Sequence, residues 1–303
     1  MKVITGNASK ELGQFIANKL GIQLSCVRVS RFADGEINVE VPTDLYNREV
    51  FIIQATDHPV NDNFMELCLI VDAVKRIGAK KIIAIIPYYG YSRQDRIIDN
   101  NNFRSALSAR VVANFIEAAG VHEIAVIDLH SSQIEGFFNI PITNLNCFEV
   151  FVDHIEKKDL AIVAPDVGAL GRARAFAKVL NTNYNIVVID KYRERAGISQ
   201  VMNIIGEVAN KNCVIVDDIV DSGGTLCNAA HALKDAGAKS VMACITHGVL
   251  SGSAVEKISV LDKLIITNTI LPKFTQTHKI EVVSITNVLI DYILKIQEDK
   301  DVN

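Results

Sequence analysis

The chain has 303 residues, which is enough for two domains of ordinary size that each have a hydrophobic core. Hydrophobic residues make up 49% and charged residues 22% of the chain, as in soluble globular proteins. The net charge of −4 argues against general nucleic-acid binding, which requires a basic surplus, and no apolar run is long enough to span a membrane.

Strands alternate with helices along the first half of the chain. Apolar patterning predicts a strand and turn over 3–7, strands over 24–32, 37–41, 49–54, 81–87 and 123–129, and helices over 10–20, 61–78 and 105–119. An Asp-Gly step at residues 34–35 predicts a hairpin turn between the second and third of these segments. The polar stretch 99–102 predicts a loop.

The same alternation continues through the second half. Strands are expected over 160–164, 185–189 and 240–246 and in the apolar run from Cys213, with helices over 172–180 and 226–236 and a short strand and helix within 280–296. This order predicts an α/β fold in which mainly parallel sheets are flanked by helices. We place a domain boundary at the turn around Pro141, which gives domains 1–143 and 144–303 and leaves open which domain the C-terminal segment packs on.

The stretch from Cys213 to Thr225 is the most specific signal in the chain. A β-branched run leads through two adjacent acids, Asp217 and Asp218, into a short turn before a helix. Glycines in the turn let several N–H groups converge on one anion, and the helix start adds N–H groups and partial positive charge. We therefore predict that the turn binds a phosphate and that the acids accept hydrogen bonds from vicinal hydroxyls, as in a ribose phosphate. The turn residues are Asp221, Ser222, Gly223, Gly224 and Thr225.

Polar side chains also follow other strands at their carboxyl ends, where ligands collect in open parallel sheets. They are Asp128, His130, Asp166, Lys191 and Arg193. His130 and Asp166 are candidates for holding a divalent cation near phosphates. A structural role for the histidine also fits, because Mg²⁺ prefers carboxylates and waters.

Lys191 and Arg193 begin a charged segment without apolar periodicity. Two interpretations remain open: a solvated surface loop, or a mobile basic arm that closes over phosphates and neutralises charge during a transfer. Arg93 and Arg96 suit phosphate binding for the same electrostatic reason, since a guanidinium forms paired hydrogen bonds with phosphate.

The turn from Phe32 to Glu36 is, by pattern alone, a hairpin tip, although an aromatic ring with two carboxylates also suits a nucleobase. The stretch 168–173 lacks the glycine spacing of a dinucleotide-binding turn, so we reject a nicotinamide site. The remaining histidines have no ligand-like spacing. Six well-separated cysteines without a Cys-x-x-Cys pair favour reduced thiols in a cytoplasmic protein.

Together these motifs resemble those of the ribose-phosphate diphosphokinase family, which makes phosphoribosyl pyrophosphate. The segment 214–225 resembles the ribose-phosphate motif that this family shares with phosphoribosyltransferases. The features that separate the family from those enzymes lie at 32–36, 61–63, 91–96, 128–138 and 190–193. The resemblance covers nearly the whole chain and implies two related phosphoribosyltransferase-like domains.

The resemblance implies transfer of a diphosphoryl group from ATP to the 1-hydroxyl of ribose 5-phosphate, with release of AMP and with Mg²⁺ as cofactor. It assigns ATP to the N-terminal domain and ribose 5-phosphate to the C-terminal domain, at the acid pair and the 221–225 turn. ATP would be bound by Phe32, Asp34, Gly35, Glu36, Arg93 and Gln94, the metal by His130 and Asp166, and Lys191 and Arg193 would be the catalytic pair. It also implies a homo-oligomer, most often a hexamer, whose adenine hairpin reaches a neighbouring subunit's site.

Some positions depart from the family's usual residues. Ala169 replaces a second glycine, Ser132 and Glu135 replace proline and glutamine, and Tyr46-Asn47 replaces Arg-Gly. If position 169 requires a positive φ, alanine there costs about 1 kcal/mol. Segments 46–47 and 97–103 carry regulation by phosphate and ADP in many members, and 97–103 is longer and less basic here than usual. The resemblance therefore implies catalysis and leaves that regulation open.

Two alternatives share the ribose motif. A phosphoribosyltransferase would use it on an existing pyrophosphate donor, but the ATP-like clusters of the N-terminal half argue against this. A non-catalytic regulatory subunit of the same family is the second alternative, and the presence of Lys191, Arg193, His130 and Asp166 argues against it.

Overall fold

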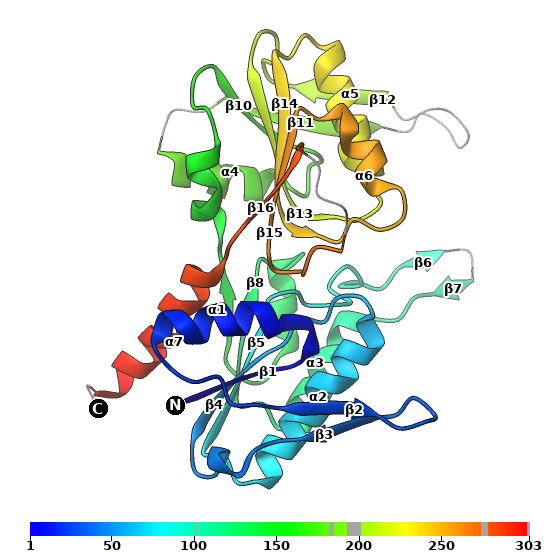
Figure 1. Ribbon diagram of the computed structural model, residues 1–303. Helices are drawn as coiled ribbons and strands as arrows, with labels where there is room; N and C mark the ends of the chain where they lie inside the picture. The colour runs from blue at the N-terminus through cyan, green and yellow to red at the C-terminus, as the bar shows by residue number, and fades with distance from the viewer. Residues whose placement is uncertain (101, 182–184, 193–200, 274–277, 302–303) are drawn as a thin grey trace. The chain divides into compact units, whose positions relative to one another are not determined.

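A computed structural model describes residues 1–100, 102–181, 185–192, 201–273 and 278–301 (Figure 1). The chain divides into two compact units. The first contains Met1–Asn146, Thr269–Leu271 and Ile285–Asn303, and the second contains Cys147–Asn268 and Pro272–Ser284. Among the described residues, no helix has the length and apolar character needed to cross a membrane.

The first unit is built on a five-stranded sheet in which every neighbouring pair is parallel. Its order is β1 (Lys2–Thr5), β4 (Glu49–Ile53), β5 (Lys81–Ile86), β8 (Glu123–Ile127) and β9 (Ile142–Leu145). The edge strand β9 was not predicted, because it is only half buried and its polar Thr143 and Asn144 hide the strand pattern. The boundary expected at 143 therefore falls inside β9, whereas the first unit continues to Asn146.

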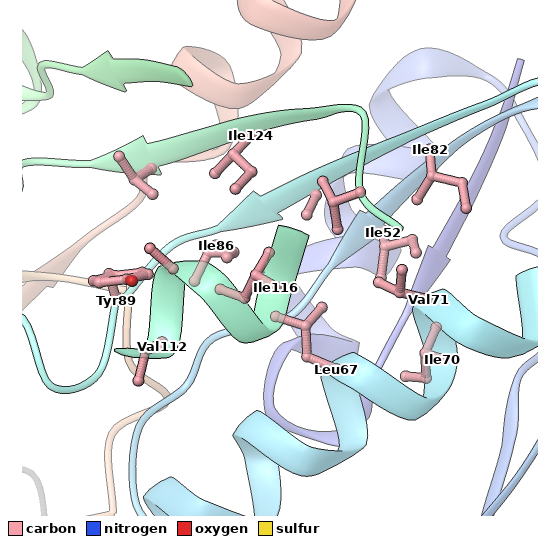
Figure 2. Close-up of a cluster of buried hydrophobic side chains, with 14 of the residues drawn as sticks. Ile52, Leu67, Ile70, Val71, Ile82, Ile86, Tyr89, Val112, Ile116 and Ile124 are labelled. Atoms are coloured by element: carbon pink, nitrogen blue, oxygen red, sulfur yellow. The ribbon is translucent and has the colours of Figure 1, made fainter. Parts of the chain in front are cut away.

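Helices cover both faces of this sheet. They are α1 (Lys10–Leu20), α2 (Val60–Arg76), α3 (Ser108–Ala119) and α7 (Thr286–Asp301). Figure 2 shows the core on one face, where Leu67 of α2 and Ile116 of α3 lie against Ile52 and Ile86 of the strands. Alternate strand residues such as Phe51 are buried on the other face, where α1 and α7 pack side by side (Figure 1).

The C-terminal helix belongs to the first unit, which answers the question that the sequence left open. Leu289 and Ile293 of α7 are fully buried, and the Tyr292 hydroxyl donates a hydrogen bond of 3.0 Å to Glu123 at the start of β8. The chain thus returns from the second unit to complete the core of the first.

Two hairpins project from the first unit. The predicted one is confirmed as β2 (Arg28–Arg31) paired antiparallel with β3 (Ile37–Glu40), and it packs along α2. The second corrects a prediction: residues 99–102 were expected to form a loop, but β6 (Asp99–Asn100) pairs with β7 (Phe103–Arg104). Two-residue strands are too short to show an apolar period.

The second unit has a seven-stranded sheet. Its order is β12 (Val201–Ile205), β11 (Asn185–Tyr192), β10 (Leu160–Ala164), β13 (Asn212–Val220), β14 (Ser240–Gly248), β15 (Lys263–Thr267) and β16 (Ile280–Val283). All neighbouring pairs are parallel except β11 with β12. The predicted α/β class, with a mainly parallel sheet in each unit, is confirmed.

Helices again flank the sheet of the second unit (Figure 1). They are α4 (Leu170–Leu180), α5 (Gly224–Asp235) and α6 (Ala254–Lys257). Phe176 of α4 packs against Phe148 and Phe151 with ring centroids 5.4 and 6.3 Å apart, while Leu226 and Leu233 of α5 join a separate core cluster. Short 3-10 helices lie at Asn7–Ser9, Thr43–Leu45, Ser132–Phe137, Phe148–His154 and Ile258–Val260.

Candidate functional site

In each unit, several predicted site residues lie at or just beyond the carboxyl ends of neighbouring parallel strands. In the second unit, β10 and β13 pair with Val163 opposite Ile215, so Asp166 and Asp218 lie the same number of residues beyond that pair. In the first unit, Arg93 follows β5 and His130 follows the adjacent β8. Each unit therefore has its own polar edge, as expected for ligand sites in parallel sheets.

The turn between β13 and α5 depends on a glycine with a positive φ. Gly223 has φ = +75°, and a Cβ there would lie 3.1 Å from Ile258 Cγ2 and 3.3 Å from the Ala254 carbonyl oxygen. Glycine is thus required both by the backbone conformation and by the available space. The exposed Ser222 and Thr225 flank this position, and α5 begins at Gly224, so the first N–H groups of the helix lie at the turn.

Asp221 supports this turn from within. Its carboxylate accepts a hydrogen bond from the Ser251 hydroxyl, and its carbonyl oxygen accepts one from the Ser251 N–H at 3.1 Å. The loop after β14 also holds Val220, whose carbonyl accepts the Leu250 N–H at 3.0 Å. A carboxylate repels a phosphate, so these bonds suit a role for Asp221 in fixing the turn.

The acid pair lies near the carboxyl end of β13, which continues to Val220. Asp218 is 4% exposed, and Arg172 of α4 places Nη1 3.8 Å from Asp217 Oδ1 and 3.6 Å from Asp218 Oδ1. Burial and the neighbouring Asp218 carboxylate raise the pKa of Asp217 to about 8, while the Arg172 guanidinium acts in the opposite direction. The pair is therefore strained by repulsion before any ligand binds.

Arg172 was not among the predicted site residues. Its only signal in the sequence is a basic residue in the first turn of the helix after a strand-end acid. That pattern is common at surfaces, so the contact with β13 could not be read from it.

Asp166 begins the turn after β10 and is half buried. Its Oδ1 accepts a hydrogen bond from the Ala169 N–H at 3.0 Å. Ala169 has φ = −80°, so the position does not need a positive φ and the expected cost of alanine does not arise. A side chain at Gly168 would begin 3.2 Å from Asp166 Oδ1, so a small residue there leaves this carboxylate accessible.

Lys191 corrects the expectation of a loop after 189. It lies in β11, where it is the partner of Met202 on the antiparallel strand β12. Lys191 therefore lies within a pair of strands. Arg193 lies outside the described residues, so the proposed pairing of Lys191 with Arg193 stays a prediction.

In the first unit, the tip of the β2–β3 hairpin is a tight turn with exposed side chains. The Phe32 N–H donates to the Glu36 carbonyl at 2.9 Å, and the Asp34 carboxylate accepts the Glu36 N–H at 3.1 Å. Gly35 has φ = +96°, and Phe32 is 57% exposed. The turn thus presents an aromatic ring and two carboxylates to the surroundings.

Two contacts to the start of α2 connect this hairpin with the segment after β5. Arg31 donates to the Gly35 carbonyl at 2.9 Å and pairs with Asp62 at 2.7 Å. One residue earlier on α2, Asn61 accepts a hydrogen bond from the Tyr91 hydroxyl. Neither connection was predicted, because each joins residues that are distant in the sequence.

Arg93 and Gln94 lie exposed in the turn after β5. The Gln94 carbonyl accepts the Ala109 N–H at 3.2 Å, and its side-chain oxygen accepts the Ser108 hydroxyl at 2.6 Å. Gln94, three residues after Tyr91, therefore fastens the turn to the start of α3.

His130 is exposed after β8, where the backbone is held by a neighbouring strand. The Asn144 side chain of β9 accepts the Leu129 N–H at 3.1 Å and donates to Glu135 at 3.3 Å. Glu135, one of the departures from the family pattern, thus supports the residue that holds the strand end beside His130.

The described residues contain no cluster of three or more His, Cys, Asp or Glu side chains arranged to hold a metal ion. His130 and Asp166 belong to different units, and their shared metal stays a prediction. The donors still fit a magnesium ion that takes most of its ligands from phosphate and water, since such sites need only one or two protein ligands.

Comparisons with known proteins agree with these features. One family model, described as the N-terminal domain of ribose phosphate pyrophosphokinase, matches residues 1–120, and a phosphoribosyl transferase domain model matches residues 142–274. The chain is 47% identical over 307 residues to the ribose-phosphate pyrophosphokinase of Campylobacter jejuni, covering 100% of this chain and 97% of that one. It is 50% identical over 275 residues to that of Burkholderia pseudomallei, covering 89% and 85%.

A solved structure is also similar over nearly the whole length. The phosphoribosylpyrophosphate synthetase from Mycobacterium smegmatis matches with a TM-score of 0.90 and 31% identity, covering 98% of this chain and 99% of that one. The similarity spans both units and the polar edge of each. The chain therefore belongs to the ribose-phosphate pyrophosphokinase family.

Proposed function

We propose that the chain transfers a diphosphoryl group from ATP to the 1-hydroxyl of ribose 5-phosphate, giving 5-phosphoribosyl 1-pyrophosphate and AMP. The observation that carries this proposal is the second unit's strand-to-helix turn, where a glycine of positive φ and the start of α5 follow the partly buried Asp217 and the buried Asp218. In the reaction, a bond forms between the 1-oxygen and the β-phosphorus of ATP. The bond from that phosphorus to the oxygen of AMP breaks, and the hydroxyl proton goes to solvent.

The second unit binds ribose 5-phosphate in this proposal. Asp217 and Asp218 accept hydrogen bonds from the vicinal hydroxyls through their carboxyl oxygens, and a carboxyl group keeps an acceptor oxygen in either protonation state. The 5-phosphate lies in the turn of Ser222, Gly223, Gly224 and Thr225, against the N–H groups that begin α5. Asp221 keeps the turn in shape through Ser251.

The first unit binds ATP. Phe32 stacks on the adenine while Asp34, Gly35 and Glu36 provide acceptors for its amino group, and Arg93 and Gln94 contact the phosphates. Lys191 and Arg193 neutralise the charge that develops on the transferred group. Such transfers depend mainly on positioning and charge stabilisation, which suits a set of residues without an obvious general base.

Mg²⁺ is the proposed cofactor, with His130 and Asp166 as its protein ligands. When bound, the ion would reduce the negative charge of the phosphates during the transfer. Asp166 supplies the hard oxygen ligand that Mg²⁺ prefers, and the segment after β8 offers His130 at an exposed position.

We further propose a cytoplasmic homo-oligomer, with a hexamer expected from the family. All six cysteines are free thiols, as expected in a reducing compartment. Three apolar side chains of the first unit are about half exposed: Met65 of α2, and Val111 and Phe115 of α3. The ring centroids of Phe115 and Phe64 are 6.2 Å apart. This apolar surface on the first unit supports a contact between subunits.

The direct test is incubation of the purified chain with ATP, Mg²⁺ and ribose 5-phosphate. We expect AMP, and none when ribose 5-phosphate is left out. Formation of ADP, or turnover that does not depend on the sugar, contradicts the proposal. Inactivity would instead favour the regulatory-subunit alternative.

Lys191→Ala tests the catalytic assignment in the same assay. We expect the turnover number to fall by about two orders of magnitude or more, because charge stabilisation in the transition state is lost. Ribose 5-phosphate binding, measured by calorimetry, should survive. Equal loss of both would show that Lys191 serves the β11–β12 pair structurally.

A further inference from the structure

Arg172 contacts the proposed ribose site, although the proposed function assigns no role to it. It lies in the first turn of α4, after the turn that begins at Asp166, and its side chain is only 12% exposed. Its Nη1 atom lies within 4 Å of one carboxylate oxygen of each acid, at 3.8 Å from Asp217 and 3.6 Å from Asp218. One largely buried arginine side chain therefore lies close enough to attract both carboxylates of the acid pair.

The pair needs such a partner. Adjacent buried carboxylates repel each other, and removing a charged group from water is unfavourable unless an opposite charge compensates. Each acid must present oxygens to a hydroxyl, so its orientation matters as much as its charge. A guanidinium is always protonated and its planar shape lets it attract two carboxylates at once.

We propose that Arg172 is the positioning residue that lets the acid pair recognise the ribose diol, and so sets the preference for ribose over deoxyribose. This inference rests on the proposed function of the second unit. A sugar phosphate without the 2-hydroxyl would leave a buried acceptor without its partner, which is the strongest basis for discrimination by polar groups. Without Arg172 the acids are no longer held for that hydroxyl, and the preference disappears.

The test compares two probes, ribose 5-phosphate and 2-deoxyribose 5-phosphate, by calorimetric titration of the full-length protein. The variants are Arg172→Met, which removes the charge but keeps much of the side-chain volume, and Arg172→Lys, which keeps the charge. Arg174→Met is the matched control, because Arg174 lies exposed on the same helix. Thermal unfolding of each variant reports on folding.

We expect the wild type to prefer ribose 5-phosphate by roughly tenfold or more. Arg172→Met should weaken ribose 5-phosphate binding by about the same factor, and deoxyribose 5-phosphate binding by no more than about twofold. The ratio of the two affinities should then approach one. Arg172→Lys should restore part of the preference, and Arg174→Met should behave as the wild type.

Three outcomes overturn the inference. Unchanged affinities in Arg172→Met would show that the guanidinium does not matter for the sugar. Equal weakening of both sugars would show that Arg172 binds the phosphate or only packs the turn. If Arg172→Met does not fold, the folded Arg172→Lys variant decides. A preference for ribose 5-phosphate equal to that of the wild type would then contradict the positioning role, and a reduced preference would support it.

Failure of the proposed function gives a different result. A wild type that does not bind ribose 5-phosphate contradicts that function, and the inference falls with it. A wild type that binds and discriminates, together with an indifferent Arg172→Met, contradicts the inference alone.

Discussion

Asp217 and Asp218 are adjacent carboxylates in a buried strand, an arrangement that is unfavourable until a ligand donates hydrogen bonds to it. Burial, and then repulsion by the Asp218 carboxylate, raise the pKa of Asp217. Binding residues of this kind reduce stability in order to recognise a ligand. This opposition between stability and ligand binding can be measured with single substitutions.

Asp217→Asn should therefore stabilise the protein while it weakens ribose 5-phosphate binding. The folded state holds a proton on Asp217 up to about pH 8, whereas the unfolded chain releases it near pH 4, so wild-type stability falls as the pH rises between these values. Asparagine does not ionise, so its advantage should grow from pH 5 to pH 8, by a few degrees in melting temperature. Thermal unfolding across this range checks the sign, and an advantage that shrinks with pH contradicts it.

Gly223→Ala should remove the phosphate cradle and reduce stability together. Alanine at φ = +75° is strained, and its Cβ would approach Ile258 and Ala254 within about 3.3 Å. We expect a loss of about 1–3 kcal/mol in the free energy of unfolding, measured with denaturant.

Gly171→Ala is the matched control for stability. Gly171 lies within α4, where a Cβ meets no atom within 4 Å. Alanine there should leave the free energy of unfolding unchanged or raise it by about 0.5–1 kcal/mol, because alanine has less backbone conformational freedom than glycine in the unfolded chain. A similar loss in both variants would show that Gly223 has no special requirement.

At the scale of elements, the start of α2 holds the hairpin tip and the segment after β5 through Arg31, Asp62 and Asn61. The Arg31–Asp62 pair is about half exposed, so its contribution is about 1 kcal/mol or less. Arg31→Ala should raise the KM for ATP by about two- to fivefold and leave the affinity for ribose 5-phosphate unchanged.

Arg28→Ala provides the comparison, since Arg28 pairs with Glu40 at the other end of the same hairpin, 3.7 Å away and largely exposed. Its KM for ATP should match the wild type. A change of equal size in both variants would assign the effect to general hairpin stability. If neither variant changes the KM for ATP, the hairpin tip does not contribute to ATP binding.

The sequence predicts those elements whose signals are contiguous. The strand from Cys213, its turn and the helix after it form one run, so both the elements and their chemistry could be recognised. Strands β9 and β12 were missed at sheet edges, and β15 was missed although its buried Leu264–Ile266 run is apolar. Strand β11 proved longer because its end is paired with β12. Arg172 could not be found because its role depends on a contact between α4 and β13.

At the scale of the whole molecule, the chain closes its first unit with its last helix. Leu289 is fully buried on α7, within a unit that otherwise ends at Asn146 apart from Thr269–Leu271. Leu289→Ala should lower the free energy of unfolding by about 2–5 kcal/mol through lost burial and a cavity. Hydrogen exchange should locate the loss in residues 1–146.

Leu294→Ala on the same helix is the control, because Leu294 is 41% exposed. It should change stability by no more than about 0.5 kcal/mol. Loss of protection in 147–268 instead would mean that α7 supports the second unit.

One reaction accounts for the family membership, the mainly parallel sheet of each unit and the proposed ribose-phosphate turn. The distinctive feature of that reaction is the transfer of two phosphates together. The most direct measurement uses ATP radiolabelled at its β-phosphorus, with ribose 5-phosphate and Mg²⁺ present, and separates the products by chromatography. We predict that the label moves entirely into a sugar 1-diphosphate while unlabelled AMP appears in equal amount. Label retained in ADP would show transfer of a single phosphoryl group and contradict the account.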